Sequence, residues 1–281
     1  MQSYNQLTPE LNFEVNAFLE QCESIDHVSS CVQMDSSLNY IKDMPCWFIE
    51  KLDDQIIGLC SIFAVNTFEA ELSTVVSPSH RHRGIGKSLV NAAKHLLKKY
   101  GYKQVLYVCD DNSVSGRAFV DTFLTRHHHT EYTLKYQKRD DHPRATRLLV
   151  TKAYERDLDQ IIQINVDAFE DDYEVASQFI TATFASPTRT AYVGQLNYKP
   201  ICTLMLGNEG GVYSINGVAV LKAFQGHGYA KELIQDVLYG LRNEEQPIII
   251  DVDSTNSAAY HLYKKIGFVE SQVIAYFVET L

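Results

Sequence analysis

The sequence predicts a mixed α/β fold in which one domain occurs twice, and three observations lead to this prediction. The chain has 281 residues with 45% hydrophobic side chains, enough apolar material for one large core or two smaller ones. Strand-like alternation and helical periodicity follow each other in the same order in both halves. A shift of 144 residues superposes residues 76–132 on residues 220–276 without a gap.

The repeat is marked by identical residues at corresponding positions. The pairs are Val76 and Val220, Gly84 and Gly228, Lys87 and Lys231, Leu89 and Leu233, Leu97 and Leu241, Val108 and Val252, Asn112 and Asn256, Ser113 and Ser257, and Tyr132 and Tyr276. The segment 140–144 is polar and contains a proline, which suits a short linker. We therefore expect an N-terminal domain at residues 1–143 and a C-terminal domain at residues 144–281.

The second half shows the expected order of elements. Its first part reads as a strand, two helices, a hairpin about the turn 197–199 and a further strand, at residues 148–152, 157–169, 174–184, 190–195, 201–206 and 213–220. A helix at 230–241 follows, because its apolar residues recur at the spacing of one helix face. A buried strand at 248–252, a helix at 258–266 ended by Gly267, and an alternating strand at 272–278 complete the half.

Charge and hydropathy exclude two classes of partner. The chain has 25 Lys plus Arg against 35 Asp plus Glu, a net charge of -10, so a nucleic-acid backbone would be repelled. The most apolar run, residues 56–65, is far shorter than the roughly 18 residues of a membrane span. The N-terminal residues show no secretion signal, so we expect a cytoplasmic protein whose six scattered cysteines are reduced.

A glycine-containing turn between the fourth strand and the central helix occurs in both halves. The first reads Arg81-His82-Arg83-Gly84-Ile85-Gly86, followed by Lys87, and the second reads Gln225-Gly226-His227-Gly228-Tyr229-Ala230, followed by Lys231. Glycine lets the backbone approach a ligand closely, and the free amides at the start of the following helix favour a phosphate. A tight connection without a ligand is the alternative, but recurrence in register favours a pyrophosphate site.

The second half also carries a distal motif, N-x-x-A-x-x-L-Y-x-x-x-G-F, at residues 256–268. With the glycine-containing turn, this motif resembles the GNAT acetyltransferase superfamily, in a tandem arrangement over nearly the whole chain. The resemblance implies a mixed, mostly antiparallel sheet in each domain, flanked by helices, whose fourth and fifth strands splay apart. It also implies acetyl-CoA (coenzyme A) as the acetyl donor and direct transfer of the acetyl group to an amine.

The resemblance gives the matched residues of the second half their expected roles. Backbone amides at Val218, Ala219 and Val220 would polarise the thioester carbonyl, and the turn from Gln225 to Lys231 would hold the pyrophosphate. Tyr263 would protonate the leaving thiolate, because a phenol stays protonated at neutral pH. Asn256 would orient either the pantetheine arm or the helix that carries Tyr263. A packed aromatic without a chemical role is the alternative for Tyr263.

The first half departs from this motif. Phe119 stands at the position of Tyr263, and a phenyl ring cannot donate a proton, although Asn112 is retained. We therefore expect a catalytically degenerate N-terminal copy. Its turn can still hold a CoA through Gly84 and Gly86, with Arg81, Arg83 and Lys87 neutralising phosphate, and a solvated turn without a ligand is the alternative.

The acceptor site is less sharply predicted. Asp253 and Glu209 are the acidic candidates for a base, and surface carboxylates are the alternative for both. The acidic run 170–174 falls between the first two helices of the second half, a region that lines the acceptor site in GNAT enzymes. Asp171 and Asp172, with Asp253, would attract a cationic acceptor, whereas a solvated loop is the alternative.

The triplet His127-His128-His129 is a candidate metal site that we do not favour. On an extended strand, His127 and His129 are the two histidines that share a face, one fewer than the three protein ligands typical of a zinc site. We therefore expect no metal.

The predicted activity is transfer of an acetyl group from acetyl-CoA to a primary amine of a small molecule or peptide. An acyltransferase with another acyl-CoA or a hydroxyl acceptor keeps the same fold. A non-catalytic acyl-CoA sensor or assembly module is a hypothesis of a different class, and retention of Tyr263 argues against it. Two fused copies mimic the pairing of single-copy GNAT proteins, so we expect a monomer or a homodimer.

Overall fold

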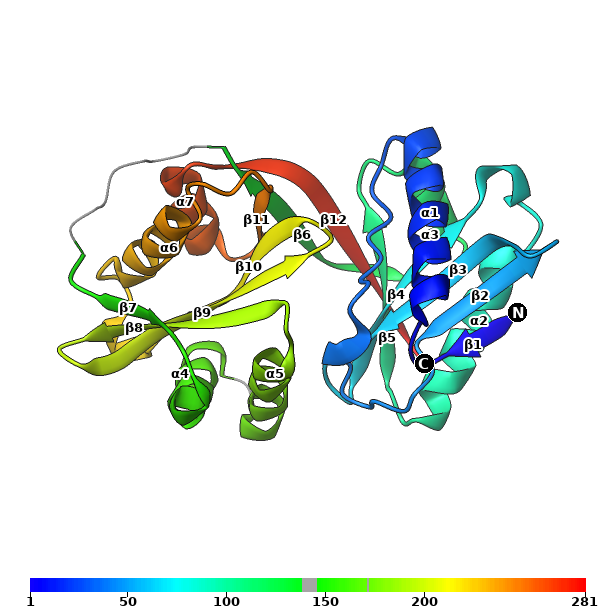
Figure 1. The fold of residues 1–281 in the computed structure, drawn as a ribbon. Coiled ribbons are helices and arrows are strands. Elements are labelled where there is room, and N and C mark those ends of the chain that lie inside the picture. Colours follow the sequence, from blue (N-terminus) through cyan, green and yellow to red (C-terminus); the bar gives the residue numbers. More distant parts are fainter. Residues whose placement is uncertain (138–145, 171) are drawn as a thin grey trace. The chain divides into compact units, whose positions relative to one another are not determined.

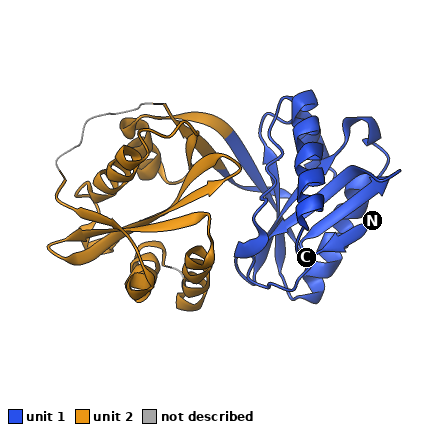
Figure 2. Cartoon of the chain, viewed as in Figure 1, with its two compact units in different colours: residues 1–130, 273–281 blue, residues 131–272 orange. Residues whose placement is uncertain are grey.

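The computed structural model describes residues 1–137, 146–170 and 172–281, which form two compact units. Unit 1 comprises Met1–Thr130 and Val273–Leu281, and unit 2 comprises Glu131–Gln272 (Figure 2). The expected boundary between residues 143 and 144 lies outside the described residues and stays a prediction.

Unit 1 is built on a sheet in the order β1-β2-β3-β4-β5-β12. Its elements are β1 (Gln2–Tyr4), α1 (Pro9–Asp26), β2 (Trp47–Leu52), β3 (Gln55–Phe63), β4 (Glu69–Val76), α2 (Ile85–Lys99), β5 (Gln104–Asp110), α3 (Val114–Val120) and the second part of β12 (Phe268–Thr280). Strands β4 and β5 are parallel, and the other neighbours are antiparallel. Helices α1 and α2 cover the sheet (Figure 1).

Unit 2 repeats this plan with the sheet order β6-β11-β10-β9-β8-β7. Its elements are the second part of β6 (Arg126–Tyr136), β7 (Leu149–Lys152), α4 (Leu158–Phe169), α5 (Tyr173–Ala185), β8 (Arg189–Leu196), β9 (Lys199–Glu209), β10 (Val212–Val220), α6 (Tyr229–Gly240), β11 (Ile248–Asp253), α7 (Ser257–Ile266) and the start of β12. Only β10 and β11 are parallel among the described pairings of this unit.

Apolar periodicity explains how the sheet of unit 2 is covered. Alternate residues of a strand point to opposite faces. Leu204 accordingly joins the core beneath α6 and α7, whereas its neighbour Met205 joins the core beneath α4 and α5. Figure 1 shows α4 and α5 on one side of the strands and α6 and α7 on the other. The mixed α/β fold in two repeated domains is confirmed, and the expected elements of the second half are all present.

The two copies exchange their last strands. Tyr132 lies in β6 and Tyr276 in β12, so the repeat makes these strands equivalent. Yet β6 pairs with β11 of unit 2, from Glu131 to Lys135, and β12 pairs with β5 of unit 1, from Ile274 to Thr280. The last strand of the N-terminal copy, β6, therefore completes the sheet of unit 2. The last strand of the C-terminal copy, β12, completes the sheet of unit 1.

The exchanged strand β12 is firmly held in unit 1. Ala275 and Phe277 belong to its hydrophobic core, together with residues of α1, α2 and the first five strands. Glu279 accepts a 2.5 Å hydrogen bond from the Tyr107 hydroxyl and pairs with Lys94 of α2. Burial and the adjacent carboxylate raise the pKa of Tyr107.

No helix of the described residues is long and apolar enough to cross a membrane. All six cysteines are thiols outside any disulfide, and Cys31 alone of them is not fully buried. Burial raises the pKa of the Cys60 and Cys202 thiols to about 12, so both stay protonated near neutral pH.

Candidate functional site

Each unit has two parallel strands that part from one another. In unit 2, the pairing of β10 with β11 ends at Ile215 and Ile250, although the strands run on to Val220 and Asp253. In unit 1, the pairing of β4 with β5 ends at Leu72 and Tyr107. The unpaired ends create an opening in each sheet, as the resemblance implies.

A β-bulge lies at this opening in unit 2. Asn216 pairs with Met205 and Ala219 pairs with Thr203, so Gly217 and Val218 together face one residue of β9. Gly217 has a φ of 56°, a conformation in which glycine is favoured. Strand β4 of unit 1 pairs with β3 residue by residue from Glu71 to Val76 and has no such bulge. The bulge redirects the backbone of Val218 and its neighbours at the point where the sheet opens.

The glycine-containing turns of the two units have the same backbone shape. Positive φ angles occur at His82 and Gly84 in unit 1 and at Gly226 and Gly228 in unit 2. Gly84 and Gly228 are the N-terminal caps of α2 and α6. Apart from the glycine and its two neighbours in the chain, no described heavy atom lies within 4 Å of the position that a Cβ would take on Gly84 or Gly226. Turns with alternating backbone conformation direct successive amides into a concave anion site, so both fit a phosphate.

Two side chains hold the turn of unit 2. Gln225 donates from Nε2 to the Val220 carbonyl over 3.0 Å. Arg147, just before β7, donates to the His227 carbonyl over 2.7 Å and forms an ion pair with Glu232 of α6. The Arg147 guanidinium also lies 4.5 Å from the centre of the Tyr229 ring. These contacts place Tyr229, Ala230 and Lys231 in the first turn of α6, where backbone amides are free of helical partners.

Tyr263 is a buried residue of α7 that faces the core. It is 7% exposed and belongs to the same hydrophobic cluster as Val220 at the end of β10 and Val252 near the end of β11. Burial raises the pKa of Tyr263 to about 12. The structure gives its hydroxyl no hydrogen-bond partner among the described residues. The phenol is therefore protonated at neutral pH and free to donate to a ligand.

Asn256 begins the helix that carries Tyr263. Its side-chain oxygen accepts from the Ala259 amide over 3.1 Å, which makes it the N-terminal cap of α7. Asn256 was expected to orient either the pantetheine arm or the helix that carries Tyr263, and this contact supports the second role.

The acidic residues expected at the acceptor site have other partners or fall outside the description. Asp253 accepts from the Thr255 amide over 2.6 Å and so shapes the turn after β11. Glu209 pairs with Arg189 at 3.3 Å across two strands. Asp172 is exposed at the start of α5, and Asp171 lies outside the described residues. Their proposed part in attracting an amine stays a prediction.

Unit 1 contains a cavity of about 930 Å³ at its own opening. It is lined by the ends of β4 and β5, by α3, by the end of α1 and by the turn, including Arg81, Gly84, Gly86 and Lys87. Arg83 is not among the lining residues, and its guanidinium donates to the Ser79 carbonyl over 3.1 Å. Phe119 lies in the cavity wall, with its ring 3.0 Å from the position of a Cβ on Gly86.

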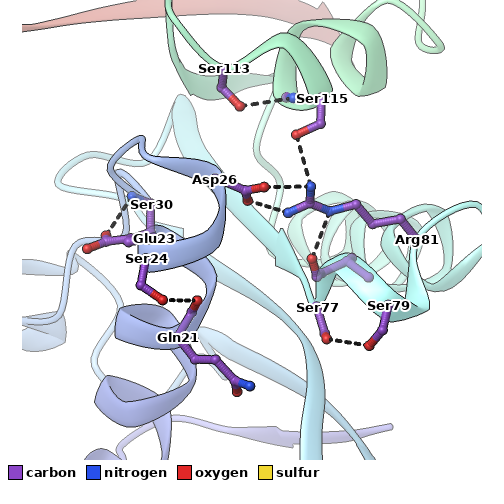
Figure 3. Close-up of polar contacts among 12 residues, drawn as sticks. Gln21, Glu23, Ser24, Asp26, Ser30, Ser77, Ser79, Arg81, Ser113 and Ser115 are labelled. Atoms are coloured by element: carbon purple, nitrogen blue, oxygen red, sulfur yellow. Dashed lines mark hydrogen bonds and ion pairs between the residues drawn. The ribbon is translucent and has the colours of Figure 1, made fainter.

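Arg81 is already engaged at the mouth of this cavity. Figure 3 shows its guanidinium between Asp26 at the end of α1 and Ser115 of α3. Its Nε also donates to the Val76 carbonyl over 3.1 Å, the counterpart of the contact that Gln225 makes in unit 2. The Asp26 carboxylate raises the pKa of Arg81. Arg81 therefore ties three elements together, and its charge is already compensated by Asp26.

The histidine triplet lies at the start of β6, and its outer members face different partners. His127 hydrogen-bonds Thr130 at 3.0 Å, whereas His129 stacks on Tyr276 with 4.1 Å between ring centres. No group of three or more His, Cys, Asp or Glu that could hold a metal is present in the described part of the chain.

Three residues of the site in unit 2 were not predicted from the sequence. Gly217 forms the bulge, Arg147 holds the turn, and Asn165 is a 5% exposed polar residue of α4. A signal existed for two of them. A glycine inside an alternating strand often marks a bulge. An asparagine on the apolar face of a helix is unfavourable unless its side chain has a hydrogen-bond partner.

Comparison with known proteins supports the assignment of the fold. The sequence model of the acetyltransferase (GNAT) family matches residues 15–121 and 158–268, one region in each half. A crystal structure of a GCN5-related N-acetyltransferase from Sphaerobacter thermophilus covers 98% of this chain and 94% of its own, with a TM-score of 0.76 and 14% identity. A tandem GNAT protein from the clavulanic acid biosynthesis pathway covers 96% of this chain and 95% of its own, with a TM-score of 0.73 and 13% identity.

Sequence relatives match parts of the chain. An N-alpha-acetyltransferase of Sulfurisphaera tokodaii is 29% identical over 138 residues, which are 43% of this chain and 80% of the relative. An uncharacterized N-acetyltransferase of Bacillus methanolicus is 46% identical over 50 residues, 17% of this chain and 42% of the relative. Two copies of a mixed sheet, each with parted parallel strands and a glycine-containing turn, define an acyltransferase fold. The chain belongs to the GNAT acetyltransferase family, with one family domain in each half.

Proposed function

We propose that the protein transfers an acetyl group from acetyl-CoA to a primary amine, and that the C-terminal copy performs the transfer. The observation that carries this proposal is the coincidence of three features in unit 2: the bulged opening between β10 and β11, the concave turn at Gln225–Lys231, and the protonated Tyr263. Unit 1 has the opening and the turn, but neither the bulge nor the phenol.

The residues of unit 2 fit acetyl-CoA. The concave turn with open space at Gly226 would receive the pyrophosphate, and the gap beyond Ile215 and Ile250 would admit the pantetheine arm. When bound, acetyl-CoA supplies the acetyl group as a thioester, so its transfer to an amine forms an amide and releases a thiol.

Each residue of the site then has a distinct task. The backbone of Val218 to Val220, redirected by the bulge, donates hydrogen bonds where negative charge develops on oxygen. Tyr263 keeps a proton on its hydroxyl oxygen for the departing sulfur, because its raised pKa prevents ionisation at neutral pH. Asn256 and Arg147 hold the helix and the turn in place.

Release of free thiol from acetyl-CoA, followed with a panel of amines, tests the proposal. Tyr263→Phe should lower turnover by about 100-fold, the usual contribution of a positioned acid. Tyr260→Phe is the matched control, since Tyr260 lies in the same helix but bonds Glu270 on the surface, and it should change turnover less than about twofold. Undiminished turnover in Tyr263→Phe would remove the acid assignment.

The cavity in unit 1 supports a second candidate function for the N-terminal copy. Its volume of about 930 Å³ and its lining by the turn suit a bound acyl-CoA that is not turned over. Calorimetry of Tyr263→Phe with acetyl-CoA would then show two binding events, and Gly84→Val should remove one of them. A single event that survives Gly84→Val would exclude this candidate.

A further inference from the structure

Asn165 is a buried polar residue whose position none of the roles above explains. It lies in α4 near its C-terminal end and is 5% exposed, on the face that packs against β9 and β10. Burying a carboxamide is unfavourable unless its polar atoms find partners. Both ends of the group therefore need an explanation.

One end of the Asn165 carboxamide has a partner, and this sets the orientation of the whole group. Nδ2 donates to the Ile161 carbonyl over 2.9 Å, one helical turn earlier. Because a carbonyl only accepts, the nitrogen must occupy that side and the oxygen must point the other way. The structure gives Oδ1 no hydrogen-bond partner among the described residues.

The free oxygen points toward the bulge of β10. It lies 3.9 Å from the position that a Cβ would take on Gly217. Gly217 and Val218 form the bulge where β10 parts from β11, so the oxygen lies beside the point at which these strands separate. An acceptor that has no protein partner among the described residues and lies beside this opening is suited to bind a donor group of a ligand.

We propose that Asn165 Oδ1 accepts a hydrogen bond from the attacking amine and positions it beside the bulge. The inference rests on the proposed function and names the residue that recognises the acceptor. During transfer, the neutral amine nitrogen forms a bond to the acetyl carbon, and the carbon–sulfur bond breaks. The departing sulfur takes the proton of the Tyr263 hydroxyl. The nitrogen loses one proton to water, from which the phenolate is protonated again, so the net products are an amide and a thiol. A primary amine still has an N–H after this loss, as the product amide does.

This chemistry predicts which acceptors Asn165 favours. A primary amine can donate to Oδ1 from the bound state to the product. A hydroxyl or a secondary amine loses its single proton in the transfer and cannot keep the bond. The geometry therefore points to primary amines as the acceptor class, in preference to N-methyl amines and alcohols.

The N-terminal copy has no equivalent group. The last three buried positions of α1, residues 18, 19 and 22, have the spacing of residues 161, 162 and 165 in α4. Cys22 lies five residues before the left-handed residue that ends α1, as Asn165 does in α4. Cys22 therefore replaces the carboxamide in unit 1, where a thiol is a weak acceptor. The same substitution in α4 should be compatible with a folded helix.

The test compares a primary amine with its N-methyl derivative in Asn165→Leu and Asn165→Cys. Loss of one neutral hydrogen bond should lower kcat/KM for the primary amine about tenfold, with the KM for acetyl-CoA changed less than about twofold. The preference for the primary over the N-methyl amine should fall by a similar factor, which loss of packing alone would not produce.

Thr183→Val is the matched control. Thr183 is a buried residue of α5 whose side chain also bonds the carbonyl one turn earlier, at 3.2 Å, so its replacement removes the same kind of group from a neighbouring helix. It should leave the preference unchanged. An unchanged preference in both folded Asn165 variants, or an equal loss in Thr183→Val, would overturn the inference alone. Absence of transfer by the wild-type protein to any amine would overturn the proposed function with it.

Discussion

The two copies share the same arrangement of strands and turn, but they differ in the residues that stand where the strands part. Both have parted parallel strands and a turn with alternating positive φ angles. Unit 2 adds the bulge at Gly217, the phenol of Tyr263 and the free oxygen of Asn165, where unit 1 has a regular strand, Phe119 and Cys22. The features proposed to bind phosphate are thus duplicated, whereas those proposed to take part in bond making and breaking occur in one copy.

Each copy also ties the end of its first helix to the segment that follows the central strand, with different residues. Asp26 pairs with Arg81 of the turn in unit 1, and Glu170 pairs with Lys222 in unit 2. Both ion pairs fix the end of the first helix, although their residues stand at different positions of the repeat. Positioning of the helix end therefore explains these charges better than phosphate binding does. The turn of unit 2 is held by Gln225 and Arg147.

The largest expected effect is a loss of stability on truncating buried rings of β12, the strand whose two parts belong to different units. Phe277→Ala and Phe268→Ala both remove a buried ring from β12, and each should cost about 3–5 kcal/mol of stability. The first should weaken unit 1 and the second unit 2, because Phe277 and Phe268 lie in different cores. Hydrogen exchange resolved along the chain measures this, and equal loss of protection in both units for either variant would contradict the separation of the cores.

A second comparison concerns the turn glycines. Gly228→Val should raise the KM for acetyl-CoA about tenfold or more, because a β-branched residue is disfavoured at a φ of 86°. Gly84→Val introduces the same strain in unit 1 and should leave kcat/KM nearly unchanged. A large loss of turnover in Gly84→Val would refute the division of labour between the copies.

A smaller difference is expected between the two helix-end ion pairs. Asp26→Asn should lower stability by about 1 kcal/mol, since the pair with Arg81 is bidentate and half-buried. Glu170→Gln should have no measurable effect, because both partners of its ion pair are exposed. Thermal unfolding of the two variants at low and high salt tests the difference, and equal shifts would show that burial of the Asp26 pair contributes nothing.

The smallest effect is the pH dependence that Tyr263 contributes to the stability of unit 2. Since burial raises the pKa of Tyr263 to about 12 from an unfolded value near 10, its contribution to stability is complete below about pH 10 and is lost between about pH 10 and 12. Tyrosinate absorbance in the difference between wild type and Tyr263→Phe should therefore appear only above about pH 11. A transition near pH 10 would show that the ring is solvated.

The sequence predicted the repeat, the elements and the turn because each is a local pattern. Gly228 and Tyr263 belong to short motifs with fixed spacing, so their places could be read along the chain. The contacts of Arg147 and the direction of Asn165 could not, because they depend on which elements become neighbours in space. Strand exchange was missed for the same reason: β6 and β12 have equivalent sequences, and nothing local distinguishes the two possible pairings.

Exchange of the last strands has a consequence for synthesis and for evolution. The ribosome makes residues 273–281 after all of unit 2, so the edge of β5 stays open until the second copy has emerged. Splitting the gene between the copies would give two products that each carry a strand suited to the other. The two domains can therefore diverge in their chemistry, but each needs a strand encoded in the other copy to complete its sheet.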